Sequence, residues 1–300
     1  MAIQEQWAYL LDPGLRAIFD LQREALAAEA VAPKLFNVST SNKAVEYDLA
    51  MGGFADWNEY EGAIEYDDPE QGYRTSYTHV EFARGFKVER RLVDDDLYNV
   101  INKRPKGLAL SAMRKREKDA ASVFNNAFSN TYAGADAVSL CNDSHPYSPS
   151  NATVQDNKGT SGLSYDTVVR TRELMREFKD DRGELTPVRP DTLLVPPEIE
   201  EEAEALLRTM NKVDVADYHY NFVGSRITNL IVWDYLTDAN NWFLIDSQMA
   251  KLYLNWFDRV PLEFAMDPTS DFRLEARFRG YMRYSYGWSD WRWVYGHDVS

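Results

Sequence analysis

The chain has 300 residues, 44% of them hydrophobic and 27% charged, which is enough for one large or two modest domains and excludes wholesale disorder. The formal net charge of −15 excludes general electrostatic binding to nucleic acid, because affinity for phosphates comes from clustered Lys and Arg. A single cysteine, Cys141, permits no intrachain disulfide and fits a reducing cytoplasm.

The N-terminal region predicts an arm with one helix. It carries Glu5 and lacks both a basic start and a long apolar core, and no apolar run of 18 residues occurs in the chain, so we expect neither a signal peptide nor a membrane span. Residues 12–14, Asp-Pro-Gly, predict a turn. Residues 15–30 predict a helix that ends before Pro33, and residues 1–42 are expected to form the arm.

A long hairpin is predicted next. Its first strand alternates Val45, Tyr47 and Leu49 with acidic residues, and its return strand alternates apolar and charged residues from Val80 to Val88, so each strand is expected to be half-buried. The segment between them is rich in Gly and acidic residues. Its chief apolar residues are Phe54, Trp57, Tyr60, Ile64 and Tyr66. Because a two-stranded hairpin has little core of its own, we expect these five side chains to contact a neighbouring copy of the chain.

One long amphipathic helix is predicted after the hairpin. Residues 94–96, Asp-Asp-Asp, are typical of an N-cap and suit the helix dipole. Pro105 predicts an interruption, and an apolar stripe then continues to Ser129. Residues 133–163 are dense in Gly, Ser, Asn, Asp and Pro, which indicates a long loop with room for a short hairpin.

A second helix and a strand-helix unit follow. Ser164 is the expected N-cap of a helix that ends near Gly183. Residues 192–195 predict a strand that leads into Pro196-Pro197 and an acidic helix, since proline and glutamate both suit the first turn of a helix.

The last third of the chain is predicted to be mainly β. Residues 227–236 and 242–245 flank a turn-forming sequence and predict a hairpin. The longest strand is predicted over about residues 272–284, with apolar side chains on one face and charged side chains on the other. Residues 288–293 hold three tryptophans, so the tail is too apolar to be free.

No motif for enzyme chemistry stands out. The sequence has no phosphate-binding loop and no nucleophile elbow. Cys141 and His145 lie four residues apart, but one Cys and one His cannot fill a tetrahedral metal site, so a turn held by local hydrogen bonds is favoured. We expect no catalytic residue, no cofactor and no metal.

Pairs of acidic residues allow one enzyme hypothesis. Glu61 with Glu65, or Asp267 with Asp271, could serve a glycosidase as its two carboxylates. Among 48 acidic residues, however, accidental pairs are expected.

The order of elements resembles the major capsid proteins of tailed bacteriophages, which have the HK97 fold. Three segments carry the resemblance: residues 124–128 (FNNAF), 140–146 (LCNDSHP) and 192–203 (TLLVPPEIEEEA). The first two are similar to the segment that follows the long helix in the Mu-like major head subunit group. The resemblance extends from about residue 35 to residue 296.

The resemblance implies an α+β, HK97-like capsid fold with four parts. These are an N-terminal arm (1–42), an extended E-loop (43–90), a peripheral domain with a long spine helix and a long strand (91–190 and 257–286), and an axial domain (191–256 and 287–300). It also implies hexamers and pentamers in which each E-loop lies over a neighbouring subunit. Some members of the family join the E-loop to a neighbour by a Lys–Asn isopeptide bond, but no residue match identifies such partners here, and we do not expect cross-linking.

We therefore interpret the chain as a structural protein, the major capsid (head) protein of a tailed phage or a related prophage. Its copies are expected to form an icosahedral shell that encloses double-stranded DNA without sequence-specific contact. Scaffolding protein, portal and decoration protein are candidate partners, a membrane is not, and the protein is expected in the virion after assembly in the host bacterial cytoplasm. The alternatives are an encapsulin-like nanocompartment shell protein and a carbohydrate-active hydrolase.

Overall fold

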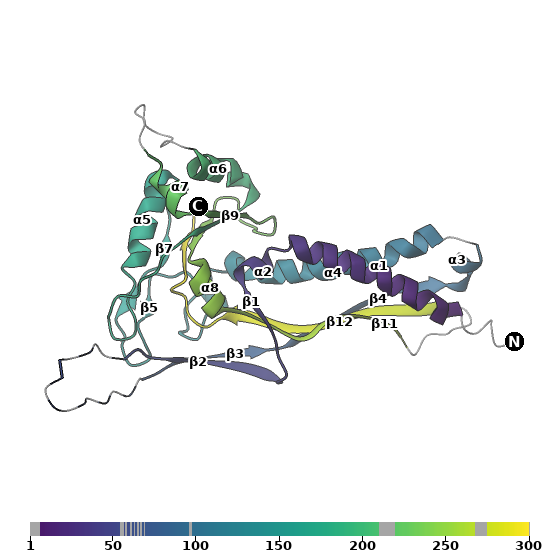
Figure 1. The fold of residues 1–300 in the computed structure, drawn as a ribbon, viewed down its shortest axis with the longest axis horizontal. Coiled ribbons are helices and arrows are strands. Elements are labelled where there is room, and N and C mark those ends of the chain that lie inside the picture. The colour runs from purple at the N-terminus through teal and green to yellow at the C-terminus, as the bar shows by residue number, and fades with distance from the viewer. Residues whose placement is uncertain are drawn as a thin grey trace.

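A computed structural model describes residues 7–54, 57, 59–60, 62, 64, 66, 68, 70–95, 98–209, 220–267 and 275–299. Figure 1 shows an elongated molecule with two regions and a projecting hairpin. A long sheet with two long helices forms one region, and a second sheet with shorter helices forms the other. Helices and strands are mixed along the chain, and the α+β class is confirmed.

The long sheet has four strands in the order β1-β11-β12-β4. Strands that are distant in the sequence pair in this sheet. Strand β12 pairs antiparallel with both β11 and β4, and β1 pairs parallel with β11. The bounds are β1 (Asn37–Thr40), β4 (Val80–Glu89), β11 (Leu254–Met266) and β12 (Glu275–Trp288). As predicted, β12 alternates, and its inward side chains are buried: Ala276, Phe278, Met282 and Tyr284.

Helices α1 (Trp7–Glu29) and α4 (Tyr98–Asn125) lie side by side along this sheet (Figure 1). Aromatic stacking fixes α1 to the sheet: the Phe19 ring lies 4.9 Å from that of Phe264 in β11. Both helices contain a proline, so the predicted turn at residues 12–14 and the predicted interruption at Pro105 are wrong. The burial of an apolar face along each helix offsets the roughly 3 kcal/mol that an interior proline costs.

The acidic run before α4 has a different role from the predicted one. Asp94 is the last residue of a short helix, α3 (Arg90–Asp94), and its carboxylate accepts a hydrogen bond from the Arg90 side chain at 3.3 Å. Asp95 follows as the C-cap of α3. Asp96, the remaining candidate for the N-cap of α4, lies outside the described residues.

The second sheet has five strands in the order β7-β13-β10-β8-β9. Strand β8 lies between β9 and β10, so the hairpin predicted for residues 227–245 is wrong: β9 and β10 both pair with β8. Every residue of β8, β10 and β13 is buried, which fits the continuous apolar sequence of β10 (WFLI). The bounds are β7 (Lys158–Gly159), β8 (Thr192–Val195), β9 (Asn229–Val232), β10 (Trp242–Ile245) and β13 (Val294–His297).

Short helices cover the second sheet. As predicted, α5 (Tyr165–Arg176) is capped by Ser164, which forms a capping box with Thr167, although α5 ends before Gly183. The Pro-Pro segment starts a 3₁₀ turn, η2 (Pro197–Ile199), that continues into the acidic helix α6. The remaining bounds are α2 (Ala32–Leu35), η1 (Asn130–Tyr132), α6 (Glu200–Arg208), α7 (Phe222–Arg226) and α8 (Ser247–Tyr253).

The hairpin consists of β2 (Val45–Met51) and β3 (Gln71–Thr78), which pair from Val45 with Thr78 to Met51 with Gln71. The predicted strand from Val80 to Val88 is present as β4, but it pairs with β12 and not with β2, so only its predicted place as the return strand of the hairpin is wrong. The loop of residues 133–163 holds a second, short hairpin of β5 (His145–Pro146) and β6 (Val154–Gln155).

Helix α4 links the parts of the molecule through charged side chains. The carboxylate of Glu117 accepts hydrogen bonds from the backbone of Val31 and Ala32 at 3.2 Å and from Trp233 Nε1 at 2.9 Å. Arg116 donates two hydrogen bonds, of 2.7 and 3.0 Å, to Asp258 of β11. Such bidentate pairs fix geometry as well as supplying energy, so α4 holds the N-terminal helices and both sheets in one arrangement. None of the described helices is both long enough and apolar enough to cross a membrane.

Candidate functional site

The projecting hairpin, residues 45–78, is the candidate functional site (Figure 1). We call it the arm, as distinct from the N-terminal arm of residues 1–42. It exposes large apolar side chains on both β2 and the segment that joins β2 to β3. The most exposed of them are Tyr47, Leu49, Met51, Phe54, Trp57, Tyr60, Ile64 and Tyr66.

Strand β2 alternates with the opposite phase to the predicted one. Tyr47 and Leu49 are exposed, whereas Glu46 and Asp48 are only half-buried. Glu46 is held by hydrogen bonds from Ser41 at 2.7 Å and from Lys43 at 3.0 Å, and these donors lower the pKa of its carboxyl group. The apolar face of β2 therefore points to solvent in the single chain, and the prediction of a half-buried apolar face fails for this strand.

The five predicted contact residues are all exposed in the single chain. The exposed fraction is 67% for Phe54, 100% for Trp57, 71% for Tyr60, 68% for Ile64 and 91% for Tyr66. Removing one large apolar side chain from water is worth roughly 1.5–3 kcal/mol. A partner that buried these side chains would therefore gain a large hydrophobic stabilisation.

The segment that joins β2 to β3 leaves the strand pair at Gly52 and Gly53, at the far end from Val45 and Thr78. We call this point, where the exposed apolar segment begins, the base of the arm, and it is clamped to the loop that follows α5. The Gly53 N–H donates to Asp181 Oδ1 at 3.0 Å, and Arg182 Nε donates to the Gly53 carbonyl at 2.7 Å. A Cβ at Gly52 would clash with the Asp181 carboxylate, which would have to move away, so glycine suits this close approach. Gly183, with a φ of +93°, lets the loop turn back beneath the arm.

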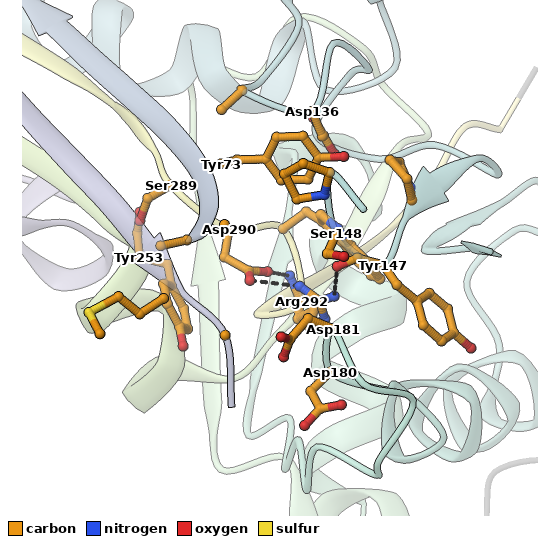
Figure 2. Close-up of a pocket in the computed structure, with 18 of the residues that line it drawn as sticks. Tyr73, Asp136, Tyr147, Ser148, Asp180, Asp181, Tyr253, Ser289, Asp290 and Arg292 are labelled. Carbon is orange, nitrogen blue, oxygen red and sulfur yellow. Dashed lines mark hydrogen bonds and ion pairs between the residues drawn. The ribbon is translucent and has the colours of Figure 1, made fainter. Parts of the chain in front are cut away.

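A cavity of about 200 Å³ lies between the base of the arm and three loops of the second region (Figure 2). Arg292 joins these loops: it forms an ion pair with Asp290 at 2.7 Å and donates to the backbone carbonyls of Lys179 at 2.8 Å and Tyr147 at 3.3 Å. Figure 2 shows this network at the centre of the cavity wall, below Tyr73. The loops thus form a fixed seat under the base of the arm.

Cys141 and His145 are buried near this seat, but their surroundings are structural. Burial raises the pKa of the Cys141 thiol, which disfavours the reactive thiolate. His145 Nδ1 lies 2.6 Å from Asp136 Oδ2, and the ring stacks on Trp291 at 4.3 Å. The prediction of purely local bonds in this turn is therefore wrong for His145, because its partners, Asp136 and Trp291, are side chains outside the turn.

The described residues offer little for catalysis. No group of three or more His, Cys, Asp or Glu side chains among them could hold a metal ion. Of the two carboxylate pairs considered for a glycosidase, Glu61, Glu65 and Asp271 lie outside the described residues. The arrangement suits surface contact, with an apolar arm held on a fixed seat.

The seat was not predictable from the sequence. Asp181 and Arg182 lie in a polar stretch that carries only a turn signal, and Gly53 is one of several glycines in the hairpin. The proximity of the two segments depends on tertiary folding across almost 130 residues. The exposure of Tyr47, Leu49 and Met51 was missed because alternation gives the period of a strand but not which face is buried.

The fold is that of capsid shell proteins of the HK97 type. The chain is similar to the capsid of a native GTA particle (15% identity, TM-score 0.54, 89% of each chain covered). It is also similar to the bacteriophage JBD30 capsid (14% identity, TM-score 0.54, covering 69% of this chain and 91% of that chain). The capsid of cyanophage P-SCSP1u gives 10% identity and a TM-score of 0.56, with 90% and 88% covered.

The sequence itself points to the same class. A family model described as phage capsid protein matches residues 72–296, which is three quarters of the chain. The chain belongs to this phage capsid protein family. No curated protein sequence matches it.

Proposed function

We propose that the chain is a major capsid protein whose copies assemble into hexamers and pentamers and close an icosahedral shell around phage double-stranded DNA. The observation that carries the proposal is the arm: its apolar side chains are exposed in the single chain, while a clamp holds its base. A neighbouring subunit would bury these side chains. Contacts of this kind, repeated by symmetry, stabilise a closed shell even where each contact is weak.

Finer assignments belong to the same proposal. The chain is a member of the Mu-like major head subunit group and is divided into the N-terminal arm (1–42), the E-loop (43–90), and the peripheral and axial domains. The pairing of β4 with β12 supports moving β4 from the E-loop to the peripheral domain. The protein works by assembly, not by turnover, and it forms in the host cytoplasm and stays in the virion. Scaffolding, portal and decoration proteins are its further partners.

The proposal is tested by expressing the chain and examining it by negative-stain microscopy and light scattering. Closed particles or ring-shaped capsomers are expected, alone or with lysate from infected cells. A strictly monomeric protein under both conditions would overturn the proposal. Particles that enclose a protein and no DNA in infected cells would favour a nanocompartment shell instead.

A further inference from the structure

Three arginines gather on helices α5 and α7 of the second region. Arg172 and Arg176 lie one turn apart on α5, and Arg226 lies on α7. The guanidinium groups of Arg172 and Arg226 lie 5.2 and 5.4 Å from the centre of the Phe222 ring. Burial and the nearby charges of Arg176 and Arg226 together lower the pKa of Arg172, so the three cations share one small area.

These arginines have no counter-charge within the described chain. None of the three forms an ion pair with a described residue, and Arg172 Nε is buried without a hydrogen-bond partner there. By contrast Arg170, on the same helix, pairs with Glu173 at 3.3 Å. A buried donor without an acceptor and three like charges are both unfavourable. In a chain with a net charge of −15, this arginine cluster therefore lacks an acidic partner among the residues that the structure describes.

The complementary charge lies on the first turn of α6 and the 3₁₀ turn before it. Four glutamates there are exposed and form no ion pair with described residues: Glu198, Glu200, Glu201 and Glu202. Glu204, further along the helix, does pair with Arg208. The helix dipole accounts for acidic residues at this end of α6, but it gives the arginine cluster no partner.

Among the described residues, the two charged surfaces form no ion pair with each other. Helix α7 contacts both α5 and α6 and lies between them in Figure 1. Helix α5 contacts β10 and β13, whereas α6 contacts β8 and β9 at the other end of the sheet. Surfaces that are complementary but displaced on one molecule suit a head-to-tail contact between copies, and such contacts close into rings.

We propose that, in each ring of subunits, the acidic turn of α6 from one copy docks on the Arg172–Arg176–Arg226 cluster of the next copy. This inference rests on the proposed capsid function and adds the specific contact within the ring. Each Arg can donate to carboxylates in a forked geometry, and the contact would give the buried Arg172 donor an acceptor. The alternation of acidic and basic surfaces would also fix the direction of the ring.

Charge reversal tests the contact. Arg176→Glu with Arg226→Glu alters the two exposed members of the cluster and leaves Arg172 on Phe222. We expect an unchanged melting temperature and a rise of about tenfold or more in the protein concentration needed for assembly, since close charge pairs at interfaces are worth at least that factor. Arg170→Glu is the matched control on the same helix and should assemble like the parent.

A second variant identifies the partner surface. Adding Glu201→Arg and Glu202→Arg to the arginine double variant restores opposite charges at every contact, because each copy supplies both surfaces, and it should restore assembly. Normal assembly of the double variant would overturn the contact, as would loss of assembly that the fourfold variant does not restore. Since the unchanged chain is assayed beside them, its own failure to assemble would overturn the capsid function instead.

Discussion

The buried His297 is the residue at which we expect a response to acid. His297 lies in β13 with its ring stacked on Trp242 at 4.0 Å and its Nε2 2.8 Å from Thr171 Oγ1. The Ser161 N–H points at Nδ1 at 3.3 Å, so this nitrogen is the unprotonated one. Burial lowers the pKa of His297 from 6.5 to about 4. The folded state therefore holds this histidine neutral.

The first prediction is a loss of stability in mild acid. Between pH 6.5 and about 4 the unfolded chain binds a proton at His297 that the folded chain does not, so the free energy of unfolding falls as the pH is lowered, by up to about 3 kcal/mol. Urea denaturation at pH 7 and pH 4.5 measures the change. His297→Gln removes this titration, and its free energy of unfolding should fall less between the two pH values. An equal fall in both proteins would contradict the assignment.

The second prediction concerns His145. Replacing it by alanine leaves the Asp136 carboxylate without its buried partner and empties the space over Trp291. We expect a loss of about 2–4 kcal/mol in the free energy of unfolding. Ser144→Ala is the matched control, because Ser144 is exposed in the same turn and bonds only to its neighbours. If both variants melted like the parent, the His145–Asp136 pair would have no structural role.

At the scale of elements, the sequence predicted well those helices and strands whose ends are fixed by residues next to them in the chain. Ser164 supplies its own cap to α5, and the sequence from Thr192 through the two prolines encodes both a buried strand and the start of a helix. The start of α5, the strand β8 and the start of the helix after it were predicted close to their observed positions because the responsible residues are adjacent in sequence. The end of α5 was not, since α5 ends at Arg176 and not near Gly183.

Elements that depend on distant partners were predicted less well. Strand β4 leaves the hairpin because Val80–Glu89 find partners in β12, almost 200 residues away. Pro13 and Pro105 are tolerated inside helices because α1 and α4 pack against each other and the long sheet. Within the described part of the chain, the outward apolar face of β2 stays exposed, with the Arg74 guanidinium 4.1 Å from the centre of the Tyr47 ring. A neighbouring subunit would bury this face. The alternation of residues along one chain cannot show that a strand face is buried by another copy.

The third prediction is that the arm is needed for closure but not for folding. Replacing Met51–Gln71 with a short Gly-Ser linker removes the five predicted contact side chains and the clamp at Gly53, while both sheets keep their pairing. The variant should keep its circular dichroism spectrum and melt within a few degrees of the parent, yet form no closed shells by electron microscopy.

Two further variants separate apolar contact from charge in the arm. Changing only the five apolar side chains to serine should also prevent closure, since burying each is worth roughly 1.5–3 kcal/mol. Changing the exposed Glu59 to Gln and Asp68 to Asn keeps those side chains and should leave assembly intact. A linker variant that fails to fold would place the arm in the subunit core, and one that closes normally would remove it from the assembly contacts.

At the scale of the whole molecule, the design separates folding from assembly. The core aromatic residues are buried around two sheets that α4 ties together, so the subunit is stable as a unit. The arm and the charged surfaces of α5 to α7 remain outside that core. The net charge of −15 suits a wall that encloses DNA without adhering to it. A chain built in this way gains its function only in many copies.

The most direct test of this account is an electron cryomicroscopy reconstruction of particles formed by the unchanged chain. The account predicts an icosahedral shell of hexamers and pentamers in which each arm lies on a neighbouring subunit and buries Phe54, Trp57, Tyr60, Ile64 and Tyr66. A closed shell in which these five side chains face solvent would contradict the role of the arm. A protein that forms no shell at any concentration, alone or in infected cells, would contradict the account as a whole.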